Sequence, residues 1–357
     1  MRGLEFPIIG TKIPHLTKKF DLTSPSGREA YFKAKVGEEI RTIRRYLRGG
    51  NFMAFLIGKK NSGKGTYAKL FTEIFGEEKV IHLSVGDLVR DVHANWDSFS
   101  KSADFETLKK VYRGYLPFDE VVDALLGRSI AALLPTEFVL SLLKVKIASL
   151  RGRSIFIDGL PREADQVSYS LYFRDLAGYT DSQDMFMLID IPEAVIDERI
   201  KYRVVCPKCQ TSRNKKLLIT SKLDYNEKTG EPHLICDNPD CDGAQKMVSK
   251  EGDDLGIAPI KGRLTKDEEI LKTVFSLHGI PKILLRNHVP VTQAKKYFDD
   301  YELTPEYILA VDKKTKKVMV KEKPWTIKDD NGVECFSLLA PPVMVAMLKQ
   351  MAEVLKS

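Results

Sequence analysis

From residue 51 onward, short apolar runs alternate with amphipathic stretches. Four of these runs are almost continuously apolar and end in turn residues: "FMAFLIG", "KVIHLSVG", "SIFIDGL" and "MFMLIDIP". Such runs are typical of strands buried on both faces of a parallel sheet. Helical patterns separate them, so the pattern predicts an α/β fold with helices on both faces of the sheet.

The pattern predicts further elements on either side of this region. A helix is expected within "REAYFKAKVGEEIRTIRRYLRGG", and another within "GRLTKDEEILKTVFSLHGIP", where Gly-Ile-Pro ends it. Residues 282–340 are rich in strand patterns, and "KVMVKEKPWTIKDDNGVECFSL" predicts a hairpin that turns at Asp330-Asn331-Gly332. The final "PPVMVAMLKQMAEVL" predicts a helix opened by proline.

Composition narrows the class of protein. The 357 residues are long for one compact domain, so we expect a main domain with inserted or appended modules. No apolar run reaches the roughly 18 residues that a membrane helix needs, and the N-terminal stretch lacks an apolar signal core. We therefore expect a cytoplasmic protein with no membrane partner. The net charge of +7 is spread along the chain, which does not favour a nucleic-acid partner.

Residues 58–66 read "GKKNSGKGT" and lie between a predicted strand and a predicted helix. Backbone N–H groups of such a glycine loop, and of the helix that follows it, bind phosphate, and Lys64 adds a positive charge. The usual phosphate loop ends in Gly-Lys-Ser/Thr. Here Gly65 follows Lys64, and a hydroxyl comes only at Thr66.

Charged residues follow the ends of the next predicted strands. Ligands of such sheets bind beyond the carboxyl ends of the strands, so we expect these side chains to converge with Lys64. Arginine is favoured where phosphate oxygens are gripped by two parallel hydrogen bonds. The charged residues are Asp87 and Arg90, then Asp158 and Arg162, then Arg199 and Arg203 four apart on one helix, and Arg263 at the start of another.

This set of cations suits phosphoryl transfer between two bound nucleotides. The transition state is loose and its charge is spread over the equatorial oxygens, so positioning and positive charge supply the catalysis without a protein nucleophile. Mg²⁺ would complete the set. Asp87 and Asp158 are the candidates to hold it through water.

Together, "GKKNSGKGT", "HLSVGDLVR", "DGLPREADQ", "ERIKYRVVCPKC" and "DDLGIAPIKGRL" resemble the adenylate kinases, in the same order along the chain, between Phe52 and Phe275. The phosphate loop of that family ends Gly-Lys-Gly-Thr. The resemblance implies a three-layer αβα P-loop NTPase fold with a helical monophosphate-binding insert and a zinc-binding lid. The implied divisions are 1–50 as an N-terminal extension, 51–90, 152–202 and 255–357 as the core with an extended C-terminal region, 91–151 as the insert, and 203–254 as the lid.

The resemblance also implies roles for individual residues. The ATP site would comprise Gly58, Ser62, Gly63, Lys64, Gly65, Thr66 and Arg199. The AMP site would comprise Ser84, Val85, Arg90, Gly159, Arg162 and Gln166. The catalytic cations would be Lys64, Arg90, Arg162, Arg203 and Arg263.

The activity implied is ATP + AMP ⇌ 2 ADP, with ATP as co-substrate, Mg²⁺ as cofactor, nucleotides as the only partners and a monomeric protein. Val85 stands where the family usually has threonine, which leaves a kinase for CMP, UMP or GMP as an alternative. Gln166 occupies the place of the family's adenine-reading glutamine. A second alternative is a nucleotide-dependent protein that binds RNA or a partner without catalysis.

Two further stretches depart from the family. The segment from Asp87 to Glu137 is longer than usual; we align "LLPTEFV" with the monophosphate-binding helix, and "YLPFDEVV" competes for that role. Glu251 stands where the family often has an arginine ahead of Asp253-Asp254.

Cysteine pairs mark the implied lid. Cys206 and Cys209 have the spacing of a zinc knuckle, and Cys236 and Cys241 form a looser pair. Four thiolates would close the site, so the zinc would be structural. A hairpin turning at Lys228-Thr229-Gly230 would fill the space between the pairs. Two alternatives stay open: Asp240 or Asp242 replaces one thiolate, or the thiols are reduced and hold no metal.

Overall fold

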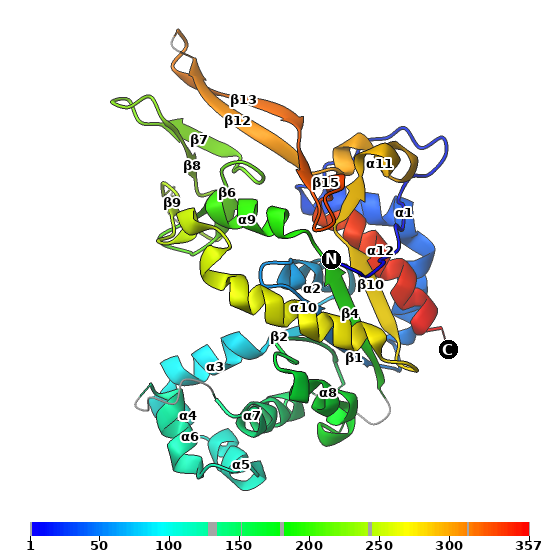
Figure 1. Ribbon diagram of the computed structural model, residues 1–357, viewed down its shortest axis with the longest axis vertical. Coiled ribbons are helices and arrows are strands. Elements are labelled where there is room, and N and C mark those ends of the chain that lie inside the picture. The colour runs from blue at the N-terminus through cyan, green and yellow to red at the C-terminus, as the bar shows by residue number, and fades with distance from the viewer. Residues whose placement is uncertain are drawn as a thin grey trace.

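A five-stranded parallel sheet forms the centre of the protein. The computed structural model describes residues 2–127, 134–150, 152–178, 182–241, 245–312 and 314–356. The strand order is β10–β4–β1–β3–β2, and helices lie on both sides of the sheet (Figure 1). The strands are β1 (Phe52–Gly58), β2 (Val80–Ser84), β3 (Ser154–Asp158), β4 (Gln183–Asp190) and β10 (Lys282–Arg286). This confirms the predicted αβα fold and its four apolar strands. Strand β10 lies in the region predicted to be rich in strands, but its place at the edge of the central sheet was not predicted.

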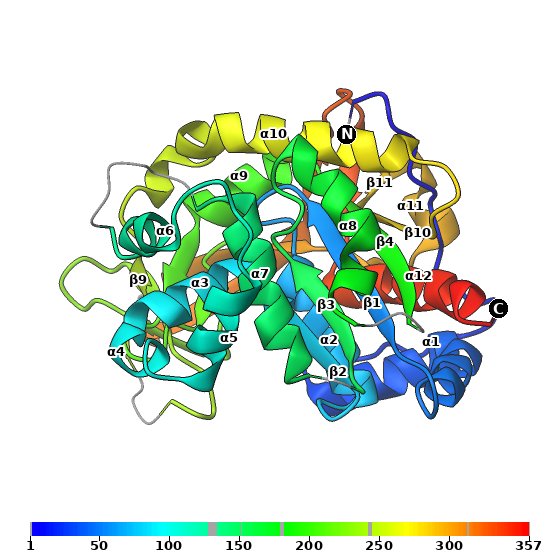
Figure 2. The same ribbon diagram turned by 90° about the horizontal axis from the view of Figure 1, so that it is seen from below.

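Alternation along the central strand explains why both faces of the sheet are covered. Phe52, Ala54 and Leu56 pack into one apolar cluster, whereas the residues between them pack into a second cluster on the opposite face. The two helical layers are visible in Figure 2. Helices α1 (Pro25–Tyr46), α2 (Lys64–Phe75) and α12 (Ala340–Val354) cover the first face, and α7 (Thr136–Ala148), α8 (Ala164–Leu176) and α10 (Lys261–Ser276) cover the second.

The chain between β2 and β3 forms a group of short helices that projects from the end of the sheet (Figure 1). Their apolar side chains form a small core of their own, which includes Leu108, Val121 and Phe138. The helices are α3 (Val85–Ala94), α4 (Trp96–Phe99), α5 (Ala103–Val111) and α6 (Phe118–Leu125), followed by α7.

The cysteine-containing segment folds into small antiparallel sheets beyond α9 (Glu193–Lys201). Strand β5 (Arg203–Val205) pairs with β6 (Ser212–Asn214) and with β9 (Val248–Ser249). The hairpin of β7 (Lys222–Tyr225) and β8 (Pro232–Ile235) encloses residues 226–231, which include the predicted turn.

The C-terminal region builds two antiparallel structures. Strands β11 (His288–Pro290), β15 (Glu334–Ser337) and β14 (Thr326–Lys328) form one sheet, and α11 (Val291–Tyr297) packs against β11 and β15. A long ribbon of β12 (Pro305–Asp312) and β13 (Lys317–Pro324) lies beside the β7–β8 hairpin (Figure 1). The Tyr307 N–H donates to the carbonyl of Lys216 over 2.8 Å, which joins the ribbon to the cysteine-containing segment.

The predicted C-terminal hairpin is therefore only half right. The turn at residues 330–332 connects β14 to β15 as expected. Residues 317–324, however, pair with the preceding strand, residues 305–312, instead of forming the first strand of the predicted hairpin. A strand pattern identifies the strand but not its partner, because any free antiparallel edge satisfies its backbone groups.

Both chain extensions meet at a buried carboxylate. Glu302 is fully buried and accepts hydrogen bonds of 2.6 Å from the hydroxyls of Thr11 and Tyr31. The buried Lys35 lies 3.7 Å from the same carboxylate. Helix α1 thus packs on the core, and these contacts join the N-terminal 50 residues to the C-terminal region.

Among the described residues, no helix is long and apolar enough to cross a membrane.

Candidate active site

The phosphate loop runs from the end of β1 to the start of α2, with Lys64 as the first helical residue. Gly63 has φ of 100°, a left-handed conformation that glycine adopts without strain. The Lys64 ammonium donates to the carbonyls of Gly58 at 2.8 Å and Lys59 at 3.2 Å, and it lies 3.9 Å from the Asp158 carboxylate. Burial lowers the pKa of Lys64, although Asp158 acts in the opposite direction.

A pocket opens beside this loop. It brings together three of the predicted cations, Lys64, Arg162 and Arg263, from three separate elements. Burial and the neighbouring Arg263 lower the pKa of Arg162, whereas Asp158 and Asp267, which also line the pocket, act in the opposite direction. Its lining residues are Leu56, Ile57, Gly58, Lys64, Asp158, Gly159, Pro161, Arg162, Arg263, Asp267 and Ile270.

Arg90 and Arg162 meet at the start of α3. A methyl group on Gly86 would lie 3.2 Å from an Arg162 guanidinium nitrogen and 3.4 Å from one of Arg90. Ser84 caps this helix, because its hydroxyl accepts the Asp87 N–H over 3.2 Å. Arg90 also pairs with Asp87, and although burial opposes the shift, hydrogen bonds from Ser84 and Arg90 lower the pKa of Asp87.

Two residues that were expected to lie around the acceptor base, Val85 and Gln166, are buried in the protein interior. Val85 is buried in the apolar cluster on the face of the sheet that α7, α8 and α10 cover. Gln166 is also buried, accepts the Arg162 N–H over 2.7 Å and donates to the Thr136 hydroxyl over 3.0 Å. Gln166 thus links Arg162 to the first residue of α7, the helix that contains most of "LLPTEFV".

Arg199 and Arg203 lie apart from the pocket lining. The prediction that both lie on one helix is wrong, because α9 ends at Lys201 and Arg203 is the first residue of strand β5. Arg199 donates to the carbonyl of loop residue Asn61 over 3.3 Å, and burial lowers its pKa. Arg203 forms two hydrogen bonds with Asp253, of 2.7 and 2.5 Å. Burial, followed by the positive charges of Arg263 and Arg203, lowers the pKa of Lys60.

Asp267 is a pocket residue that the sequence did not reveal. Its carboxylate accepts the backbone N–H of Lys60 over 2.7 Å and lies 4.0 Å from the Arg263 guanidinium. Burial raises the pKa of Asp267, although Lys64 acts against the shift. The only local signal is its position four residues after Arg263, on the same face of α10.

The four cysteines between residues 203 and 254 converge. Cys206 and Cys241 have their sulfur atoms 3.9 Å apart, and Cys209 and Cys236 have theirs 3.6 Å apart. Four thiolates at about 2.3 Å from a tetrahedral Zn²⁺ would be separated by roughly 3.8 Å, so the group fits this metal. Asp240 is exposed and does not belong to the converging group, and Asp242 lies outside the described residues.

A second group with metal-binding potential lies in the C-terminal region. His288, Asp329 and Cys335 are all buried, and their donor atoms lie within 4.8 Å of one another. The Cys335 sulfur lies 3.9 Å from the Asp329 carboxylate.

The parallel sheet, the phosphate loop and the cationic pocket at the strand ends together show that the protein has a P-loop NTPase fold. No model of a known protein family matches the chain. It is, however, 30% identical over 208 residues to an adenylate kinase of Thermotoga maritima, covering 56% of this chain and 75% of that protein. An adenylate kinase of Thermotoga petrophila is also 30% identical, with the same coverage. One of Clostridium acetobutylicum is 27% identical over 64% of this chain and 93% of its own length.

The chain therefore belongs to the adenylate kinase family, a family of nucleoside monophosphate kinases. This confirms the family that the motifs indicated.

Proposed function

We propose that this protein catalyses ATP + AMP ⇌ 2 ADP by direct in-line phosphoryl transfer. The observation that carries the proposal is the convergence of Lys64, Arg162 and Arg263 on one pocket beside the phosphate loop. These cations come from α2, the β3–α8 loop and α10. A mere nucleotide binder would not need cations placed for both a donor and an acceptor phosphate.

The donor, ATP, would bind with its phosphates along the loop from Gly58 to Thr66, which includes Ser62, Gly63 and Gly65. Helix α2 directs its N-terminal N–H groups toward this loop, which favours an anion. Lys64 is held by two loop carbonyls, and it would turn its ammonium to the phosphates at little cost in reorganisation. Arg199, which is partly buried beside the loop, would lie against the base of ATP.

The acceptor, AMP, would bind through the guanidinium groups of Arg90 and Arg162, which already meet at Gly86. Ser84, Val85 and Gly159 would complete this part of the site. Gln166 would read the adenine base once it exchanges its hydrogen bond to Thr136 for one to the base. Because Val85 is buried and offers no hydroxyl, this choice of base depends on Gln166.

Transfer would depend on cations that neutralise the charge of the phosphoryl group in flight. Arg263 lines the pocket and would act there directly. Arg203 would join when the lid closes and would then exchange Asp253 for phosphate oxygens. Mg²⁺ would supply further positive charge to the phosphates. Asp158 lines the pocket and suits a water-mediated role in holding the ion, whereas Asp87 is paired with Arg90.

We also propose the division of labour among the inserts. Residues 91–151 would bind the monophosphate, residues 203–254 would form a lid with structural Zn²⁺ on its four cysteines, and residues 51–90, 152–202 and 255–357 would form the core, with residues 1–50 as an extension. Closure of the insert and lid would exclude water, because an exposed phosphoryl group would be lost to hydrolysis.

The test is phosphotransfer from ATP-Mg²⁺ to AMP, CMP, UMP and GMP in parallel, with the diphosphates measured. Turnover with AMP alone supports the proposal, and a preference for another base moves the acceptor without changing the mechanism. The variants K64M and R162A should lose most turnover, whereas R41A, which removes an exposed arginine on α1, should keep it. Absence of turnover with every acceptor would refute the proposal in favour of a binding protein.

A further inference from the structure

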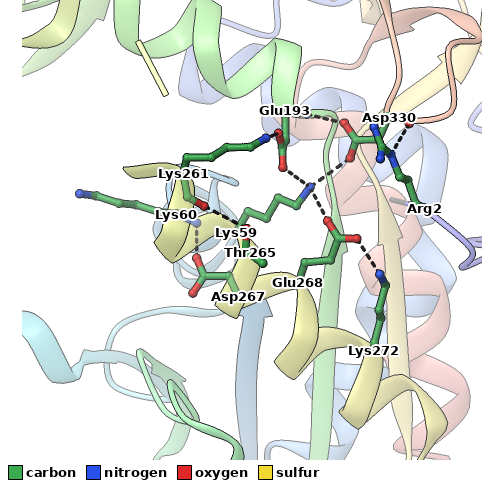
Figure 3. A network of polar contacts seen from close by, with 10 residues as sticks. All are labelled: Arg2, Lys59, Lys60, Glu193, Lys261, Thr265, Asp267, Glu268, Lys272 and Asp330. Atoms are coloured by element: carbon green, nitrogen blue, oxygen red, sulfur yellow. Dashed lines mark hydrogen bonds and ion pairs between the residues drawn. The ribbon is translucent and has the colours of Figure 1, made fainter. Parts of the chain in front are cut away.

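A second lysine of the phosphate loop points away from the pocket. The Lys59 side chain is fully buried, and its ammonium lies 3.0 Å from both Glu268 and Asp330 and 3.2 Å from Glu193 (Figure 3). These carboxylates come from α10, from the β14–β15 turn of the C-terminal region and from the first turn of α9. Three segments far apart in the sequence therefore meet at one residue of the loop.

The network around Lys59 is balanced in charge. Lys261 pairs with Glu193, and Lys272 lies 2.9 Å from Glu268, so three lysines face three carboxylates (Figure 3). Burial acts to lower the pKa of Lys59, but Asp330 and Glu268 outweigh it and the pKa is raised. A lysine buried in this way stays charged only while its partners are present.

Asp330 binds two elements of the kinase core at once. One carboxylate oxygen contacts the Lys59 ammonium, and the other accepts the backbone N–H of Glu193 at the start of α9 over 2.8 Å. Arg2 donates to the Asp330 carbonyl over 3.1 Å, which adds the N-terminal stretch to the same contact (Figure 3). The turn is itself ordered by Asp329, whose carboxylate accepts the N–H groups of Asn331 and Val333.

The backbone of Lys59 faces the phosphate site while its side chain is anchored outside it. The Lys59 carbonyl accepts the Lys64 ammonium over 3.2 Å. The next residue, Lys60, donates its N–H to Asp267 on α10, directly before Glu268. A shift of the anchored side chain would therefore move the carbonyl that orients Lys64.

We propose that Lys59 is a positioning residue of the ATP site, and that the β14–β15 turn of the C-terminal region braces the phosphate loop through Asp330. The inference rests on the proposed function, in which ATP phosphates occupy that loop. On this inference the C-terminal region helps to hold the ATP-binding loop in place. Because the brace contacts the loop and not Arg90 or Arg162, it acts on ATP and not on AMP.

The decisive variant is D330N. Asparagine keeps an acceptor for the Glu193 N–H, and it replaces the charged oxygen that accepts from Lys59 with an NH2 group, which cannot accept. D312N is the matched control, because Asp312 is an aspartate of the same C-terminal region whose carboxylate, among the residues that the structure describes, accepts hydrogen bonds from its own turn, at Lys314 and Thr315. Titration calorimetry would give the Kd of ATP and of AMP separately for each variant, with melting temperatures measured alongside.

We expect D330N to raise the Kd of ATP about fivefold or more and to leave the Kd of AMP unchanged. K59M should raise the Kd of ATP further, and the K59M/D330N double variant should bind ATP no more weakly than K59M alone, because both changes break the same contact. D312N should match the wild type for both ligands.

Two results would overturn the inference: a Kd of ATP for D330N within twofold of the wild type, or an equal loss of ATP and AMP binding. The second would mean that the network serves only general stability. Neither outcome affects the proposed function, which fails separately if the wild-type protein binds ATP and AMP without transferring phosphate. Wild-type protein that bound no ATP would refute both.

Discussion

Replacing Gly86 with alanine should separate acceptor binding from stability. Gly86 is the second residue of α3, and its backbone is not left-handed, so alanine fits the helix. In a helix, alanine is favoured over glycine by up to about 1 kcal/mol, and the unfolded chain also loses freedom. The variant should therefore be as stable as the wild type or slightly more stable.

The added methyl group would nevertheless crowd both acceptor arginines. It would lie 3.2 Å from Arg162 and 3.4 Å from Arg90, so each guanidinium must shift by a few tenths of an ångström. A hydrogen bond to a charged group contributes about 1.5–3 kcal/mol, and weakening one such bond by half costs about 1 kcal/mol. We expect the KM for AMP to rise roughly fivefold to tenfold.

The measurement is the KM for AMP at saturating ATP, the KM for ATP at saturating AMP, and the melting temperature. G262A is the matched control: Gly262 is likewise the second residue of its helix, α10, and a methyl group there meets nothing within 4 Å. An unchanged KM for AMP in G86A would contradict the acceptor assignment. A fall in melting temperature with a rise in both KM values would contradict the steric reasoning.

Three further changes test other parts of the molecule. D267N should strengthen Mg²⁺-free ATP binding several-fold near neutral pH, because it removes a negative charge from the phosphate pocket and keeps an acceptor for the loop N–H. Since burial raises the pKa of Asp267, the difference in ATP affinity between D267N and the wild type should shrink as acidification neutralises the wild-type carboxylate. A difference in affinity that does not change with pH in titration calorimetry would contradict this. C236S should lose the one zinc per chain expected from metal analysis and lower the melting temperature, whereas C335S, outside the four-cysteine group, should retain that zinc; equal metal content in both variants would argue against the lid site. E302Q should lower the free energy of unfolding, measured by urea denaturation, by about 3 kcal/mol, because the buried carboxylate that accepts from two hydroxyls and faces Lys35 loses its charge. E38Q, at an exposed site, is the control. An equally small change in both variants would contradict the view that Glu302 joins the two chain extensions.

Much of the candidate site could be predicted from the sequence because its signals are local. The phosphate loop is a contiguous stretch after a buried strand, and Arg162 and Arg263 follow or open recognisable elements. Parallel strands bring their carboxyl ends to one edge, so the order of the elements was enough to predict that Lys64, Arg162 and Arg263 would meet. The roles of Gln166, Val85 and Arg203 rest on the resemblance to the family and remain predictions.

Other parts of the site depend on partners distant in sequence. Lys59 and Lys60 are adjacent and look alike in the sequence, yet one is buried among three carboxylates and the other keeps its side chain partly exposed. Arg203 reads as a phosphate ligand, but in this conformation it pairs with Asp253. Asp267 reads as one more acid on a charged helix, and only the approach of the loop to α10 makes it a pocket residue.

By itself, the sequence determined four of the five strands of the sheet, the phosphate loop and the family, because burial periodicity and contiguous motifs are properties of neighbouring residues. Only the tertiary structure decided that β10 forms one edge of the sheet, that residues 317–324 pair with the preceding residues 305–312, and that the C-terminal turn reaches Lys59. Strand partners and ion pairs are selected by which edges and charges remain unsatisfied once the core has packed. That selection involves the whole chain at once, and no local pattern contains it.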